Sequence, residues 1–277
     1  KLLRIMKKLL KLLWCLFLVF VLFITSCNNM SNKNKDENES DSTSISKFDE
    51  IKNTYFKIPF PSELFWLIKD FGATYSRNIL NPINNIKNYT TSTKKALNFG
   101  IYASDLFYSS VFKQNQETFK YYKQVKQLGN ELNIVEGFDE NIAKRVDKNL
   151  NNSDSLFAIT SEANTNAINY LESLGKSNIL PYITLGGWIE SVYIASKQVK
   201  TFNAKDPIVS LIMDQNFLLD NIIGLFGTVE QDEEIVNTTN KLKEIQKVYD
   251  EADNPVTKKQ FEKIVDSISK LRNEYIK

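Results

Sequence analysis

The chain has 277 residues, with 35 basic and 33 acidic side chains, two cysteines and no histidine. This length suits one large domain or two small ones. The absence of histidine excludes Ser-His-Asp and Cys-His catalysis and the histidine-based zinc and iron sites.

The chain opens with a basic stretch and then an apolar run. Five basic side chains and no acidic ones occur in residues 1–11, and residues 12–24 are apolar without interruption. As a helix this run would span roughly 20 Å, short of the ~30 Å of a bilayer's hydrocarbon. The pattern predicts a secretory signal peptide rather than a resident transmembrane helix. Its start could be Lys1 or Met6, since Met6 also precedes two lysines.

The apolar run ends at Ile24-Thr25-Ser26-Cys27, an aliphatic residue and two small residues before a cysteine. This tetrad resembles the lipobox of bacterial lipoproteins. The resemblance implies that the Cys27 thiol receives a diacylglyceryl group, that residues 1–26 are cleaved off, and that the new amine is acylated. Two or three acyl chains would hold the chain firmly on a membrane. An uncleaved anchor, or a chance cysteine after an apolar helix, is the alternative.

Processing at Cys27 would change both the redox chemistry and the charge of the chain. Cys15 would be discarded and Cys27 lipidated, so no thiol would remain for a disulfide. Removing five basic residues leaves 30 basic and 33 acidic ones, a net charge of −3. We therefore expect no nucleic-acid partner.

Residues 27–47, which follow the signal peptide, have almost nothing to bury and are rich in Asn, Ser, Lys and acidic side chains. This composition predicts a disordered tether behind the lipidated cysteine. The acidic cluster at 35–39 resembles the surface-export signal of some Bacteroidota lipoproteins, and a solvated linker is the alternative. We expect the protein to be located in the cell envelope, anchored to the outer membrane. Whether it lies on the periplasmic or the surface face is left open.

Residues 48–277 predict a helical domain. They are poor in Gly and Pro and show 3.6-residue periodicity, without the alternation typical of strands. The clearest apolar stripe is Phe261, Ile264, Val265, Ile268, Leu271 and Tyr275. The expected fold class is all-α, an antiparallel multi-helix bundle or a solenoid-like array. We expect helices at about 62–71, 91–113, 115–133, 139–149, 153–174, 179–200, 207–225, 230–251 and from 255 onward, with Asp206 and Asn254 as caps before prolines.

Two segments, 96–108 and 183–195, are apolar nearly all round and are expected at the centre. Aligning Gly100 with Gly186 superimposes Tyr102 on Trp188, which a helix-hairpin duplication or chance could produce. A glycine inside a helix costs about 1 kcal/mol relative to alanine. Close approach of two helices, or a ligand, would explain that cost.

A wider resemblance covers roughly residues 58–200. Asn81-Pro82, Tyr89-Thr90, residues 95–106 and residues 186–190 resemble an uncharacterised family of helical lipoproteins from Bacteroidota. The resemblance implies a helical, envelope-anchored protein and no particular activity.

Carboxylates are the remaining candidates for chemistry. Asp105 and Glu190 lie in the two apolar segments, where an ionised group needs a partner. They could approach each other or share a basic partner such as Arg77 or Arg145. One interpretation is a pair of glycosidase-like carboxylates about 5–9 Å apart. The others are a buried polar network that fixes helix register, a ligand contact, or acids that reach solvent.

Asp105, Glu190, Tyr102 and Trp188 together form the candidate polar or ligand cluster. The aromatic side chains could wall a sugar or peptide groove, or they could be core. We assign no catalytic residue and expect no metal and no cofactor. The leading hypothesis is a membrane-anchored binding or scaffold module whose partner is an envelope protein, a glycan or a peptide. The alternative is a glycan-active envelope hydrolase that uses Asp105 and Glu190.

Overall fold

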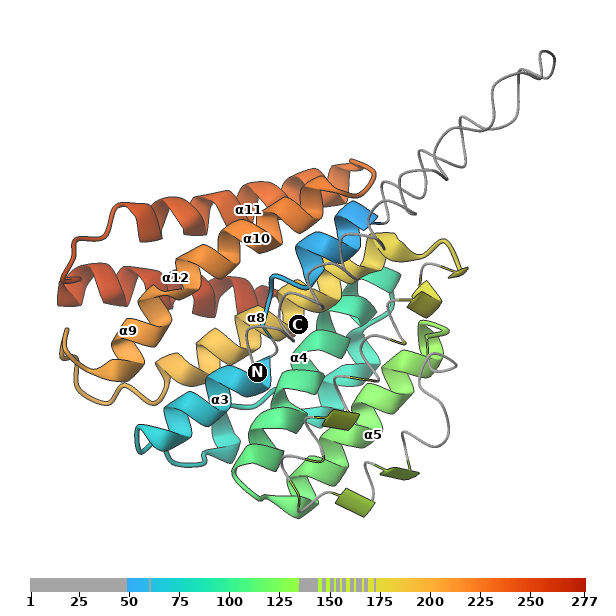
Figure 1. The fold of residues 1–277 in the computed structure, drawn as a ribbon, viewed down its shortest axis with the longest axis horizontal. Helices are drawn as coiled ribbons and strands as arrows, with labels where there is room; N and C mark the ends of the chain where they lie inside the picture. Colours follow the sequence, from blue (N-terminus) through green and yellow to red (C-terminus); the bar gives the residue numbers. More distant parts are fainter. Residues whose placement is uncertain are drawn as a thin grey trace, which may run out of the picture. The chain divides into compact units, whose positions relative to one another are not determined.

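The chain forms helices joined by turns throughout the residues that the structure describes (Figure 1). The computed structural model describes residues 49–59, 61–134 and 173–277, with scattered positions between 135 and 172. No strand occurs among these residues, so the all-α prediction is confirmed for them. All of them belong to one compact unit.

The helices have well-defined bounds, and residues 49–55 are also helical. In chain order they are α3 (Pro61–Asp70), η1 (Arg77–Ile79), η2 (Ile83–Asn88), α4 (Ser92–Val111), α5 (Asn115–Glu131), η4 (Ser177–Ile179), α8 (Leu180–Ser196), α9 (Pro207–Met213), α10 (Gln215–Gly227), α11 (Glu233–Asp250) and α12 (Lys258–Tyr275).

Several sequence-based predictions fall outside this description. The signal peptide at 1–26, the lipid attachment at Cys27 and the tether at 27–47 lie outside the described residues. The helices expected at 139–149 and 153–174 are described only at scattered positions, which are helical apart from Asn152. These predictions stay predictions.

Helices α4 and α8 form the centre of the fold. The sequence of α8 is apolar on nearly every face, and α3, α4, α9, α10 and α12 all pack against it. Gly100 lies against Ile183, and further along the same two helices Asp105 lies near Glu190. The contacts therefore advance in the same direction, and α4 runs parallel to α8 (Figure 1).

Neighbouring helices on either side of this pair run antiparallel, as short connections predict. Lys95 near the start of α4 forms an ion pair of 3.0 Å with Glu131 at the end of α5. Lys263 of α12 lies 3.1 Å from Glu251, just after α11. Figure 1 shows α10, α11 and α12 on one side of α8, and α4 and α5 on the other.

The segment Pro207–Gly227, which contains α9 and α10, is the one helical stretch in the described part of the chain with the length and hydropathy to cross a membrane. Its apolar side chains Leu219, Ile222 and Leu225 are fully buried. The segment packs against α8 and α11. A core helix has the same composition, so this hydropathy does not indicate a membrane location.

The capping predictions have two outcomes. Asp206 caps α9 as expected, because its Oδ1 accepts a hydrogen bond of 2.8 Å from the N–H of Ile208. Pro207 is the first residue of that helix. The prediction that Asn254 starts the last helix is wrong. Thr257 is the cap, and it forms a capping box with Gln260.

Candidate functional site: a buried polar junction of α4, α8 and α12

Glu190 of α8 and Arg272 of α12 form a buried, two-pronged ion pair. Arg272 Nε donates to Glu190 Oε2 at 2.8 Å, and Arg272 Nη2 donates to Oε1 at 2.7 Å. Glu190 is fully buried and Arg272 is 4% exposed. Two parallel charge-assisted bonds fix both the distance and the orientation of the partners. The pair therefore sets how α12 docks on α8.

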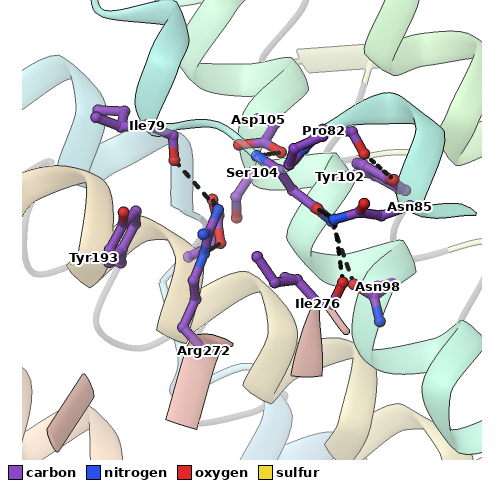
Figure 2. Close-up of polar contacts among 12 residues, drawn as sticks. Ile79, Pro82, Asn85, Asn98, Tyr102, Ser104, Asp105, Tyr193, Arg272 and Ile276 are labelled. Carbon is purple, nitrogen blue, oxygen red and sulfur yellow. Dashed lines mark hydrogen bonds and ion pairs between the residues drawn. The ribbon is translucent and has the colours of Figure 1, made fainter. Parts of the chain in front are cut away.

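Two further contacts hold the guanidinium of Arg272. Its Nη2 donates to the backbone oxygen of Ile79 at 3.2 Å, and its Cζ lies 4.3 Å from the centre of the Tyr193 ring (Figure 2). Tyr193 lies one turn after Glu190 on α8. The aromatic face and the carboxylate thus approach the same cation from one helix.

Arg77 and Arg145, the basic partners suggested by the sequence, do not join this junction. Arg77 pairs with Glu117 at 3.2 Å, and Arg145 pairs with Glu162 at 2.8 Å. Both arginines are exposed in their pairs. A usable signal did exist, because Arg272 continues the four-residue spacing of Ile264 and Ile268 on the buried face of α12. A basic residue on an apolar stripe needs a buried acid.

Asp105 of α4 lies beside this ion pair, as the sequence suggested for the two acids. It is fully buried. Its Oδ2 accepts a hydrogen bond of 3.2 Å from the Asn81 N–H, and its Oδ1 has no hydrogen-bond partner. Burial raises the pKa of Asp105 well above its usual range, and the Glu190 carboxylate raises it further. Arg272 and the Asn81 N–H lower this pKa by less.

A second set of polar side chains supports the irregular segment between η1 and η2. The Tyr121 hydroxyl donates to the backbone oxygen of Asn81 at 3.0 Å, and the Tyr102 hydroxyl donates to the backbone oxygen of Pro82 at 3.0 Å. Asn81 Nδ2 in turn donates to the Tyr89 hydroxyl at 3.0 Å. Buried backbone outside regular helices must find partners, and these side chains supply them. Burial raises the pKa of both Tyr102 and Tyr121 above the usual tyrosine value.

Two asparagines bind the end of α12 to the rest of the junction. Asn98 Nδ2 of α4 donates to the Tyr275 oxygen at 2.9 Å. Asn85 Nδ2 donates to the Ile276 oxygen at 3.1 Å (Figure 2). The last carbonyls of a helix have no partner within it, so these bonds satisfy otherwise unpaired acceptors. Neither asparagine is among the candidate residues expected from the sequence, although Asn98 stands out as a polar residue within an apolar segment.

Of the four cluster residues expected from the sequence, Asp105, Glu190 and Tyr102 meet at the junction, whereas Trp188 does not. Trp188 precedes Glu190 by two residues, which places it on the opposite face of α8. It is 4% exposed, and its indole N–H has no hydrogen-bond partner. Four aromatic side chains are buried and therefore belong to the core rather than to the wall of a groove: Tyr102, Tyr108, Tyr121 and Trp188.

The junction is a closed polar network. No member of the acid and arginine set is more than 4% exposed, so a solvent-borne substrate has no contact with these carboxylates. Within the described part of the chain, no group of three metal-ligating side chains gathers. A shallow surface hollow does lie along α12, but a single helix face lines it, from Lys259 to Lys270, opposite the face that carries Arg272.

Comparison with protein-family models, with curated proteins and with solved structures finds no match to this chain.

Proposed function

We propose that this chain is a lipid-anchored envelope lipoprotein whose helical body serves as a binding or scaffold module. The observation that carries the proposal is the tetrad Ile24-Thr25-Ser26-Cys27 after a basic start and a short apolar run. The polar junction supports the second part of the proposal. Its acid Glu190 is committed to Arg272 and joins α8 to α12, which is a structural task.

The alternative, an envelope hydrolase that uses Asp105 and Glu190, gains no support from the geometry. A glycosidase pair must contact the glycosidic oxygen and the anomeric carbon of a bound sugar. Both carboxyl groups are fully buried, and Glu190 is committed to Arg272. Turnover of a glycan that is lost on replacing both acids, in variants that remain folded, would revive the alternative.

The anchoring part is tested with Cys27→Ala and the matched control Cys15→Ala. We expect Cys27→Ala to lose incorporation of labelled palmitate and to leave the membrane fraction. Cys15→Ala should keep both properties, because Cys15 would lie in the cleaved signal. Mass spectrometry of the mature N-terminus checks the cleavage site. An unmodified N-terminus, or membrane retention of Cys27→Ala without acylation, would refute the lipid anchor.

The binding part is tested by cross-linking in intact cells, purification from detergent-solubilised membranes and identification of the attached molecule. A purified candidate glycan, peptide or envelope protein must then bind the helical body saturably. Failure of every cross-linked candidate to bind the purified body would contradict a binding role while leaving the lipid anchor intact.

A further inference from the structure

The buried junction contains two carboxyl groups but one guanidinium. Arg272 uses Nε and Nη2 on Glu190, and Nη2 also donates to the Ile79 oxygen. No hydrogen bond or ion pair joins Arg272 to Asp105 in the described structure, although the two lie close enough to interact electrostatically. Among the described residues, Arg272 is therefore paired with Glu190 alone.

Among the described residues, the other groups that interact with Asp105 carry no formal charge to balance a second carboxylate. Four phenols interact electrostatically with Asp105: those of Tyr75, Tyr102, Tyr121 and Tyr193. The hydroxyls of Tyr102 and Tyr121 donate to the Pro82 and Asn81 oxygens rather than to Asp105. From the segment before η2, Asp105 receives a single neutral N–H, that of Asn81.

An ionised Asp105 would thus be a negative charge without an ion-pair partner of its own in the protein interior, next to another carboxylate. Such a charge is costly to bury, and like charges at short range cannot both ionise easily. A proton bound to Oδ1 of Asp105 would remove this cost, because that atom is buried and accepts no hydrogen bond.

We propose that the Asp105 carboxyl is a proton-binding site: it takes one proton from solvent onto Oδ1, facing the Glu190 carboxylate. The balance is one proton gained by one carboxylate, with no other bond made or broken. The junction then holds one cation, one anion and one neutral acid. The proton becomes part of the contact among α4, α8 and α12, so the stability of this contact is linked to pH.

The sign of the linkage follows from the direction of the shift. The pKa of Asp105 is higher in the folded chain than in the unfolded chain. Its stabilising contribution is therefore complete below the unfolded value, about 3.9. The contribution is lost progressively as the pH rises toward the folded value. In that window the unfolding equilibrium constant should change by up to tenfold per pH unit because of this one group.

The test compares the wild-type chain with Asp105→Asn across pH 4 to 9. An asparagine amide has the shape of the protonated acid, so it still accepts from the Asn81 N–H and still donates toward Glu190. We expect Asp105→Asn to lose the pH-dependent part that Asp105 contributes to denaturant unfolding. Asp70→Asn, at an exposed position, should keep the wild-type profile. A constant ratio of unfolding constants between the wild type and Asp105→Asn across this range would overturn the proposal.

A direct measurement on the wild-type chain covers the case in which Asp105→Asn does not fold. Carboxyl ¹³C resonances of aspartate-labelled protein should include one that keeps the chemical shift of a protonated acid at a pH where the other aspartates have ionised. Asp70→Asn should retain this resonance. If every aspartate resonance of the folded wild type titrates in the usual aspartate range, at about pH 3.9, Asp105 holds no additional proton and the proposal fails.

Discussion

Gly100 of α4 and Gly186 of α8 contact each other's helices reciprocally. A Cβ atom on Gly100 would lie 2.0 Å from the backbone oxygen of Ile183, three residues before Gly186. A Cβ atom on Gly186 would lie 1.9 Å from the backbone oxygen of Leu97, three residues before Gly100. The contact is thus locally two-fold symmetric. This confirms close helix approach as the reason for both glycines, and the duplication of a helix hairpin remains a hypothesis.

The first prediction concerns these glycines. Gly100→Ala and Gly186→Ala should each destabilise the chain by about 3 kcal/mol, because backbone rather than a flexible side chain must move to admit the methyl group. Gly224→Ala on α10 is the matched control. There a Cβ atom would find Thr54 Cγ2 at 3.9 Å, an ordinary contact, so alanine should add about 1 kcal/mol of stability. Urea denaturation measures all three, and equal effects would contradict the close packing.

The second prediction concerns the ion pair. Arg272→Met should cost about 3–5 kcal/mol of unfolding free energy, because it leaves Glu190 buried without its partner. Combining it with Glu190→Leu should recover most of that loss, since both charges then disappear together. Arg272→Lys should fall between wild type and Arg272→Met, because lysine keeps the charge but not the two-pronged geometry. A double variant no more stable than Arg272→Met would show that this pair is not coupled.

The third prediction concerns the end of α12. Asn98→Ala removes the donor to the Tyr275 oxygen and leaves a buried acceptor unpaired. We expect a loss of about 1–3 kcal/mol and faster hydrogen exchange in the last turn of α12. Asn237→Ala, at an exposed site on α11, should leave both quantities nearly unchanged. Unaltered exchange in Asn98→Ala would mean that this bond does not hold the helix end.

The fourth prediction separates two possible starts of the last helix. Thr257→Ala should cost about 1 kcal/mol, because the Thr257 side chain accepts the Gln260 N–H in the capping box. Thr257→Ser keeps the hydroxyl and should cost much less. Asn254→Ala should have little effect on α12, since Asn254 lies outside the cap. Thermal unfolding of the three variants provides the measurement, and a larger loss for Asn254→Ala would restore the original assignment.

The sequence predicted the helices well where one local pattern determines them. The stripe from Phe261 to Tyr275 marks the buried face of α12, and the near-uniform apolarity of 183–195 marks α8 as central. It also identified Asp105 and Glu190 as acids that need partners. It did not identify Arg272 as the partner, because that choice depends on which of several helices packs over Glu190. Local periodicity carries no information about such long-range pairing.

The position of α12's cap shows the same limit at short range. Asn254-Pro255 and Thr257 are both valid start signals, and the capping box with Gln260 favours the second. Trp188 is a second example, because its position in an apolar segment does not indicate which face of the helix contacts the junction. Tertiary contacts decide the case of Trp188, whereas the local capping box decides the start of α12.

The reciprocal seating of Gly100 and Gly186 also constrains how the protein is made. The two residues are far apart in the chain, and the α4–α5 hairpin is complete long before α8 leaves the ribosome. Before α8 is synthesised, the surface of α4 from Leu97 to Ile101 has no helix to pack against. Burial of this surface is slow, because the long chain segment between α4 and α8 must close first. A shortened chain that stops ahead of Leu180 would therefore expose this surface permanently, making it a target for chaperones, proteolysis or aggregation.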